Sequence, residues 1–167
     1  MLSSAGNIPR EFSLLKYLCI AILLFSGLTA AADDYAYDPD ADPGATYQQA
    51  IAQAGQQGKL VLLVFGSEWC PDCRSLNEKM GQSPLSETVR QNFIVAHVDI
   101  GNWDKNMAFT EQFGEPVAKG IPSIAIVDAD KTLLYVSEAG EFASARSTDL
   151  ATLDSWLRDR LAAIRQQ

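Results

Sequence analysis

The chain has 167 residues, of which 47% are hydrophobic, 21 are acidic and 13 are basic, so its formal net charge is −8. This composition predicts one small soluble domain with its own core. The negative charge argues against a nucleic-acid-binding protein and against binding to an anionic membrane.

The first 32 residues have the layout of a secretory signal peptide. Arg10 and Lys16 precede the apolar run 17–28, and small residues follow it up to Ala32. This run is shorter than the roughly 20 apolar residues that a membrane-spanning helix needs. We therefore expect cleavage after Ala32 and export to the periplasm or the medium, with an uncleaved membrane anchor as the alternative.

Residues 33–45 contain five aspartates, two prolines and a glycine. This composition buries little apolar surface and is typical of a flexible acidic linker. The folded domain is expected over 46–167, beginning with a short helix from Thr46 to Gly55 or Gly58.

Strands and helices are expected to alternate along the rest of the chain. Apolar runs rich in β-branched residues predict strands, and capping residues followed by apolar residues at helical spacing predict helices. The expected strands are 60–65, 93–100, 123–127 and 132–137, and the expected helices are 71–80, 84–92, 105–113 and 150–164. This order predicts an α/β fold with a central mixed β-sheet flanked by helices on both faces.

A C-x-x-C motif, Trp69-Cys70-Pro71-Asp72-Cys73, lies between a predicted strand and a predicted helix. Cys70 would be the helix N-cap, where unpaired N–H groups and the helix dipole stabilise a thiolate. We expect Cys70 to be the exposed nucleophile and Cys73, one turn further, to be the buried resolving thiol. Pro71 suits the first helical position, since it has no N–H to leave unpaired.

Two carboxylates lie close to Cys70 in the sequence. The charge of Asp72 opposes thiolate formation on Cys70, which favours a reductant or isomerase over a strong oxidant. Glu68, two residues before Cys70, is expected to be solvent-exposed and is a candidate for proton transfer.

A zinc site and a purely structural disulfide are the alternatives for this motif. A structural zinc ion needs four ligands, but Cys19 lies in the leader and the domain has one histidine, His97. A structural bridge between residues three apart closes a small loop and gains little chain entropy. Redox chemistry is therefore favoured, and no metal site is expected.

The order of elements resembles the thioredoxin superfamily over residues 46–164: a strand, W-C-x-x-C, a helix, and later Ile121-Pro122 opening a hairpin before a closing helix. The resemblance implies that Pro122 is cis and packs beside the cysteine pair. It also implies that the backbone of Ile121 binds an extended substrate peptide, and that Trp69 shields the disulfide and contacts partners. The strand entry 59–61 and the exported context are similar to the reductase domain of DsbD-type thiol:disulfide interchange proteins.

One departure from thioredoxin concerns proton transfer. Val64 stands six residues before the first cysteine, where cytosolic thioredoxins carry a buried aspartate. His97 falls where thioredoxin carries the lysine that pairs with that aspartate, so we expect its side chain near Val64 and Cys73. His97 is therefore a candidate proton shuttle, with a hydrogen-bonded structural histidine as the alternative.

Several residues beyond the motif are candidates for partner contact. Trp103 lies in a segment longer than the matching one of thioredoxin, and is either a loop anchor or part of a substrate rim. Phe142 and Arg146 follow the place of a glycine-bearing loop that borders the peptide groove in the family. Trp156 is expected in the core.

We therefore expect a thiol:disulfide oxidoreductase of the cell envelope that reduces or isomerises disulfides in exported proteins through Cys70 and Cys73. No dissociable cofactor is expected, because the cysteines carry the electrons. A reductant in an oxidising compartment needs a membrane thiol:disulfide electron donor; nucleic acid is not expected as a partner, and a monomer is expected. The alternatives are a module that binds copper or a client protein through the same cysteines, and an adaptor whose disulfide stays inert.

Overall fold

The computed structural model describes residues 36–138 and 140–166. The expected signal peptide 1–32 lies outside the described residues. Within the two described ranges, no helix is both long and apolar enough to span a membrane.

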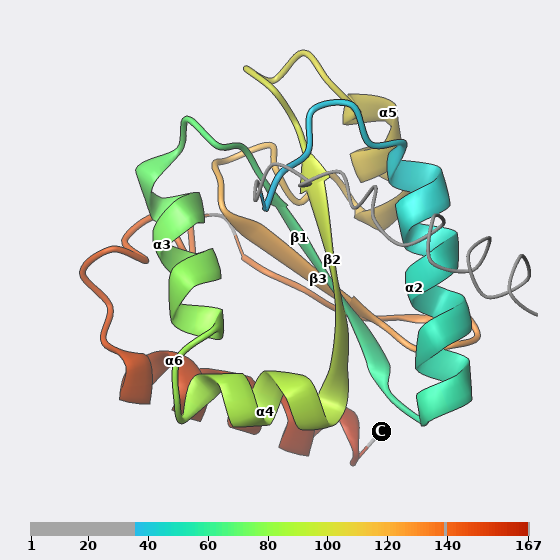
Figure 1. The fold of residues 1–167 in the computed structure, drawn as a ribbon, viewed down its shortest axis with the longest axis vertical. Helices are drawn as coiled ribbons and strands as arrows, with labels where there is room; N and C mark the ends of the chain where they lie inside the picture. Colours follow the sequence, from blue (N-terminus) through green and yellow to red (C-terminus); the bar gives the residue numbers. More distant parts are fainter. Residues whose placement is uncertain (1–35, 139, 167) are drawn as a thin grey trace, which may run out of the picture. The chain divides into compact units, whose positions relative to one another are not determined.

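A mixed sheet of four strands forms the centre of the domain, in the order β2-β1-β3-β4 (Figure 1). β1 (Leu60–Gly66) pairs parallel with β2 (Phe93–Asp99) and antiparallel with β3 (Ser123–Val127), and β3 pairs antiparallel with β4 (Leu133–Val136). β1 and β3 are buried along nearly their whole length, since helices cover both faces of the sheet. The predicted α/β class and mixed sheet are confirmed.

The helices divide between the two faces of the sheet (Figure 1). One face carries α2 (Pro43–Gln57) and α5 (Met107–Thr110), and the other carries α3 (Pro71–Met80), α4 (Leu85–Asn92) and α6 (Leu150–Ile164). A 3-10 helix, η1 (Glu111–Phe113), follows α5, where the sequence predicted one longer helix over 105–113. The other predicted strands and helices of the domain are found within a few residues of their expected bounds.

Successive side chains of β1 build two separate core layers. Phe65 packs against Phe113 of η1, which also packs edge-on against Tyr47 of α2. Leu62 points to the opposite face and shares a small apolar pocket with Leu76 of α3 and Leu157 of α6. The sheet is therefore held by packed side chains on both of its faces.

The predicted linker 33–45 extends too far, because α2 starts inside it at Pro43. Asp42 caps the helix by accepting a hydrogen bond from the Ala45 N–H at 2.7 Å, and Pro43 occupies the first helical position. The helix thus begins before Thr46. The prediction from composition assigned Asp42 and Pro43 to a loop, although together they form the start of a helix.

Tyr37 also belongs to the folded domain, with 1% of its side chain exposed. Its ring fills the space beside Gly66, where an added Cβ would come within 2.6 Å of it. The same ring meets the ring of His97 edge-on, at 5.1 Å between centroids. The missing side chain at Gly66 therefore makes room for a residue from the segment before α2.

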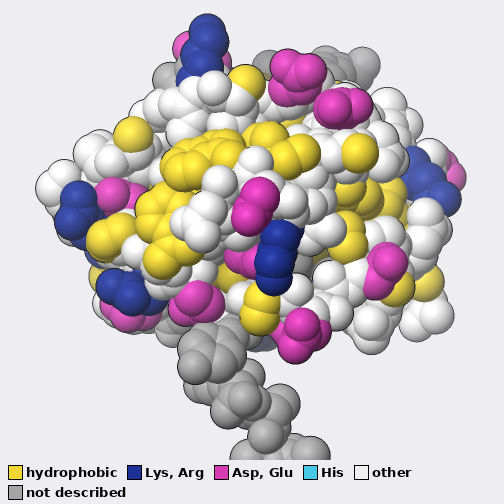
Figure 2. Space-filling view, turned by 90° about the horizontal axis from the view of Figure 1, so that it is seen from above, with side chains coloured by type: hydrophobic (Ala, Val, Ile, Leu, Met, Phe, Trp, Pro, Cys, Tyr) yellow, Lys and Arg dark blue, Asp and Glu magenta, His cyan; other side chains and the backbone are white. Residues whose placement is uncertain are grey.

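The predicted site residues gather at one end of the sheet. Parallel β1 and β2 both end there, and β3 begins there because it runs antiparallel to β1. The connecting segments at this end carry the C-x-x-C motif and Pro122. Figure 2 shows this face from above: hydrophobic side chains form a broad patch, and both acidic and basic side chains border it.

Candidate active site

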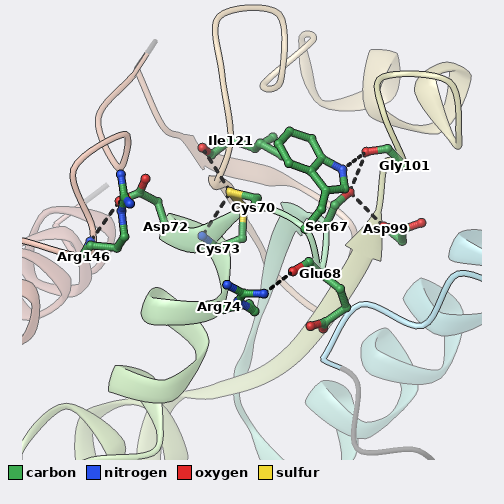
Figure 3. The surroundings of a disulfide bond; sticks show 11 residues. Ser67, Glu68, Cys70, Asp72, Cys73, Arg74, Asp99, Gly101, Ile121 and Arg146 are labelled. Carbon is green, nitrogen blue, oxygen red and sulfur yellow. Dashed lines mark hydrogen bonds and ion pairs between the residues drawn. A yellow bond between two sulfur atoms is a disulfide. The ribbon is translucent and has the colours of Figure 1, made fainter.

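Cys70 and Cys73 form a disulfide at the N-terminus of α3, with their Cα atoms 5.3 Å apart (Figure 3). Cys70 is the N-cap and Pro71 is the first helical residue, as predicted. The Cys73 N–H points at the Cys70 Sγ, with 3.2 Å between nitrogen and sulfur. After reduction, this N–H and the positive end of α3 stabilise a thiolate on Cys70.

The expected exposure of Cys70 is wrong for the disulfide form, since only 4% of the residue is exposed. Its Sγ lies 3.8 Å from the carbonyl oxygen of Ile121, in the loop that leads into β3. The Ile121–Pro122 peptide bond is cis, as the family resemblance implied. The peptide backbone before β3 therefore lies directly beside the sulfur that is expected to react.

Asp72 is buried and paired with a residue from a distant segment. Its Oδ1 accepts hydrogen bonds from the backbone N–H of Arg146 at 3.0 Å and from the Arg146 Nε at 3.2 Å (Figure 3). The guanidinium compensates part of the negative charge that was expected to oppose a Cys70 thiolate. Arg146, predicted as a partner contact, thus acts on the charge beside the cysteine pair.

Lys79, near the end of α3, holds the same distant segment. Its Nζ donates to the carbonyl oxygens of Ala145, Arg146 and Thr148, at 2.6, 3.0 and 2.6 Å. The segment 140–149 is therefore attached to α3 at both ends of the helix. The sequence contained no local signal for this contact, because the partners lie more than sixty residues apart.

The two aromatic residues predicted around this segment both pack in the core. Phe142 is buried and packs edge-on against Trp156, at 4.8 Å between centroids, so its prediction as a partner contact is wrong. Trp156 packs against the core as expected, and its Nε1 donates to Glu141. A buried phenylalanine contributes packing rather than recognition.

Trp69 is half exposed and is bonded to the loop that follows β2. Its Nε1–H donates to the Gly101 carbonyl oxygen at 2.8 Å. The Ser67 Oγ lies 2.8 Å from the same oxygen and 2.9 Å from Asp99 Oδ1, within hydrogen-bond reach of both (Figure 3). Sequence reasoning missed Ser67 and Asp99, because their roles depend on the pairing of β1 with β2.

Glu68 is half buried, so its expected exposure is wrong. Its Oε1 accepts a hydrogen bond from the Tyr37 N–H at 3.0 Å. The Glu68 carbonyl oxygen accepts another from Arg74 Nη1 at 3.2 Å. This residue therefore ties the segment before α2 to the loop that carries Cys70.

His97 lies beside Val64, as expected, since the two residues are paired between β2 and β1. Burial lowers the pKa of His97 to about 4, so the imidazole is neutral at pH 7. In the described part of the chain, its Nε2 is buried and has no hydrogen-bond partner. A neutral imidazole with a buried, unpaired Nε2 therefore contacts the ring of Tyr37.

The cysteine pair is the reactive group of this face. Among the described residues, no group of three or more His, Cys, Asp or Glu side chains is placed to hold a metal ion. The two sulfurs supply half of the ligands that a structural zinc ion needs. Their arrangement at a helix N-terminus instead suits thiol–disulfide exchange.

Comparisons with known proteins agree with this geometry. A family model described as thioredoxin-like matches residues 42–129. No curated protein sequence matches the chain significantly.

Among solved structures, the chain is similar to a disulphide isomerase from Xylella fastidiosa Temecula1, at 30% identity and a TM-score of 0.73, over 77% of this chain and 98% of that one. It is similar in fold to the oxidised DsbD C-terminal domain of Neisseria meningitidis, at 17% identity and a TM-score of 0.53, over 72% and 97%. A structure described as DsbH oxidoreductase matches at 18% identity and a TM-score of 0.52, over 85% and 98%.

Proposed function

Because this chain belongs to the thioredoxin-like family, we propose that it is a thiol:disulfide oxidoreductase that reduces or isomerises disulfides in exported proteins. The observation that supports this most directly is the Cys70–Cys73 disulfide at the N-terminus of α3. The Cys73 N–H is already aimed at the Cys70 sulfur, so the site is arranged to stabilise the attacking thiolate. The 30% identity to a disulphide isomerase supports the same chemistry.

The reaction proceeds in two exchanges. The Cys70 thiolate attacks one sulfur of a client disulfide, forms a mixed disulfide, and releases the other client sulfur as a thiolate that takes up a proton. The Cys73 thiolate then attacks the Cys70 sulfur, forms the Cys70–Cys73 disulfide and releases the second client thiol. The client gains two electrons and two protons, and the protein is left oxidised.

The proton on Cys73 needs an acceptor, because Val64 offers none. His97 is paired with Val64 across the sheet, and its Nε2 is free of hydrogen bonds within the described residues. A neutral imidazole in this position is our candidate for the proton shuttle. Glu68 is the second candidate, although its carboxylate already accepts the Tyr37 N–H.

The cellular setting is proposed from the leader sequence. Residues 1–32 have the pattern of a cleaved signal peptide, which supports a periplasmic or secreted protein. Thiols do not stay reduced there without a supply of electrons, so a membrane thiol:disulfide donor would recharge the pair. The cysteines themselves carry the electrons, and we propose no dissociable cofactor.

The first experiment is insulin reduction by the purified domain with dithiothreitol as electron donor. We expect Cys70→Ser to fall to the rate of the buffer control, because the attacking thiol is gone. Cys73→Ser should accumulate a mixed disulfide with the client, since nothing resolves it. Stoichiometric uptake of Cu(I) by a protein that does not reduce insulin would instead favour a binding module.

A further inference from the structure

Two tryptophans project from the face that carries the cysteine pair. Trp69 and Trp103 are each 46% exposed, and in the described residues only Leu133 is a comparably exposed large hydrophobic side chain. The two rings contact each other, with 5.4 Å between their centroids. Exposed aromatic side chains that lie together mark interaction surfaces more often than single exposed residues do.

The loop 101–106 holds Trp103 in an unfavourable backbone conformation. Trp103 has a φ of 60°, in the left-handed region that costs a bulky residue on the order of 1 kcal/mol. Hydrogen bonds to the Gly101 carbonyl oxygen and from Asn106 Nδ2 to the Asp99 carbonyl oxygen, at 2.8 Å, fix both ends of the loop. The exposed ring is therefore held beside Trp69 rather than left to turn inward.

A pocket of about 450 Å³ lies beside Trp69 and is lined in part by loop 101–106, which carries Trp103. Trp69 and Tyr37 form part of its wall, and the charged residues that line it are Glu68, Asp99, Asp104 and Lys105. Lys105 is 3.9 Å from Asp99 and pairs with it. Across the described ranges, neither Glu68 nor Asp104 has an ion-pair partner, so the pocket is left with negative charge.

From these contacts we propose that Trp69, Trp103 and the adjoining pocket form a docking surface for a client segment with a lysine or arginine close to its disulfide. The long alkyl stem of such a side chain packs on the tryptophans, and its cation interacts with the ring faces and with Glu68 and Asp104. This substrate preference rests on the proposed function. The proposed contact places the cation of the client beside Trp69. Because Trp69 directly precedes Cys70, the recognised basic residue lies near the client cysteine.

Charge complementarity supports a basic client over an acidic or a purely apolar one. The chain has a net charge of −8, and the pocket beside Trp69 is lined by three carboxylates and one lysine. An acidic segment would meet Glu68 and Asp104 as like charges. An apolar segment would bury the tryptophans but would supply no cation to Glu68 and Asp104.

The test uses two synthetic peptides, each carrying one cysteine as a mixed disulfide with glutathione. They are identical except for Lys or Glu two residues from the cysteine. The rate constant of each with the reduced protein is measured by acid quench and chromatography at low ionic strength. We expect the Lys peptide to react about fivefold faster than the Glu peptide, in line with a cation–π contact and a nearby carboxylate.

Variants decide whether this preference arises in the pocket. Asp104→Asn and Trp103→Ala should each bring the ratio of the two rate constants close to one, and Trp103→Phe should keep most of it. Asp159→Asn, on the exposed side of α6, removes the same charge at a distance and should leave the ratio unchanged. Leu133→Ala is the matched control for loss of an exposed hydrophobic side chain.

The outcomes separate this proposal from the proposed function. A protein that reduces oxidised glutathione but treats both peptides alike keeps the proposed function and loses the docking surface. An equal loss of preference in Asp159→Asn and Asp104→Asn would assign the preference to overall charge and overturn the pocket. A protein that reduces neither the peptides nor oxidised glutathione contradicts both proposals.

Discussion

The two segments that flank the disulfide are held in place by different kinds of side chain. The Gly101 carbonyl oxygen of loop 101–106 is bonded by the neutral side chains of Ser67 and Trp69, and the loop presents the ring of Trp103 to solvent. Segment 140–149 is held by charged side chains of α3, and turns its aromatic residue, Phe142, into the core.

We infer that the two segments have different roles. Loop 101–106 serves recognition of a client, and segment 140–149 affects stability and the charge beside Cys70. The Trp103 ring takes no part in the hydrogen bonds that hold loop 101–106, so it stays exposed for a partner. The attachments of segment 140–149 use Asp72 and Lys79, so changing them alters the charge beside Cys70 or the packing of the fold. Substitutions in loop 101–106 should therefore change the choice of client. Substitutions that break the attachments of segment 140–149 should change stability and redox potential.

The largest expected effect is on stability, at Lys79. In Lys79→Met, three backbone carbonyls lose a charged donor, and we expect a loss of about 3 kcal/mol in the free energy of unfolding. Urea denaturation followed by circular dichroism measures it. Lys59→Met is the control, because Lys59 donates only to the exposed side chain of Gln57 and should change stability by less than about 0.5 kcal/mol. Equal losses in the two variants would contradict the attachment of segment 140–149 through Lys79.

A pH effect on the free energy of unfolding is expected at His97, whose ring contacts the ring of Tyr37 edge-on. Burial lowers the pKa of His97 to about 4, whereas the unfolded chain has the ordinary value of 6.5. Between these values the unfolded state binds more protons, so His97 makes the fold less stable as pH falls from 6.5 to 4. We expect this loss to be on the order of 2 kcal/mol, and to be absent from His97→Gln.

Parallel unfolding curves of wild type and His97→Gln across this range isolate the contribution of one residue. If the two proteins lose stability equally, His97 is not the group responsible. The same variant tests the proposed shuttle: an unchanged pH profile of insulin reduction would exclude His97 as the proton acceptor of Cys73.

The smallest expected effect is on redox potential, through Arg146 and Asp72. Arg146→Gln leaves the Asp72 charge uncompensated, which raises the pKa of the reduced Cys70 thiol and destabilises the reduced form. We expect the reduction potential to become more negative by about 15 mV, a threefold change in the equilibrium constant with glutathione. Asp72→Asn should shift the potential in the opposite direction.

Equilibration with glutathione, read by tryptophan fluorescence, gives both potentials. Arg158→Gln serves as the control, since Arg158 pairs with Asp154 on α6 and carries the same charge. A shift of the same sign in Arg146→Gln and Asp72→Asn would contradict electrostatic control by this pair.

Local patterns explain which features could be predicted. The Cys70 N-cap, Pro71 at the first helical position and the strand 123–127 each depend on neighbours within a few residues, and all three are found. The cis bond before Pro122 followed from the family resemblance. By contrast, the part of the linker from Asp42 onward was misread, because aspartate and proline occur both in loops and at helix starts.

The sequence by itself thus determined the alternation of strands and helices and the position of the cysteine pair at a helix start, and it favoured redox chemistry over zinc binding. These depend on periodicity, capping and ligand number, which are properties of short stretches. Only the tertiary structure decided that Arg146 pairs with Asp72, that Trp103 lies on Trp69, and that Tyr37 fills the space beside Gly66. Such contacts join residues about 30 to 75 positions apart, and they form only when the whole sheet and its helices are packed together.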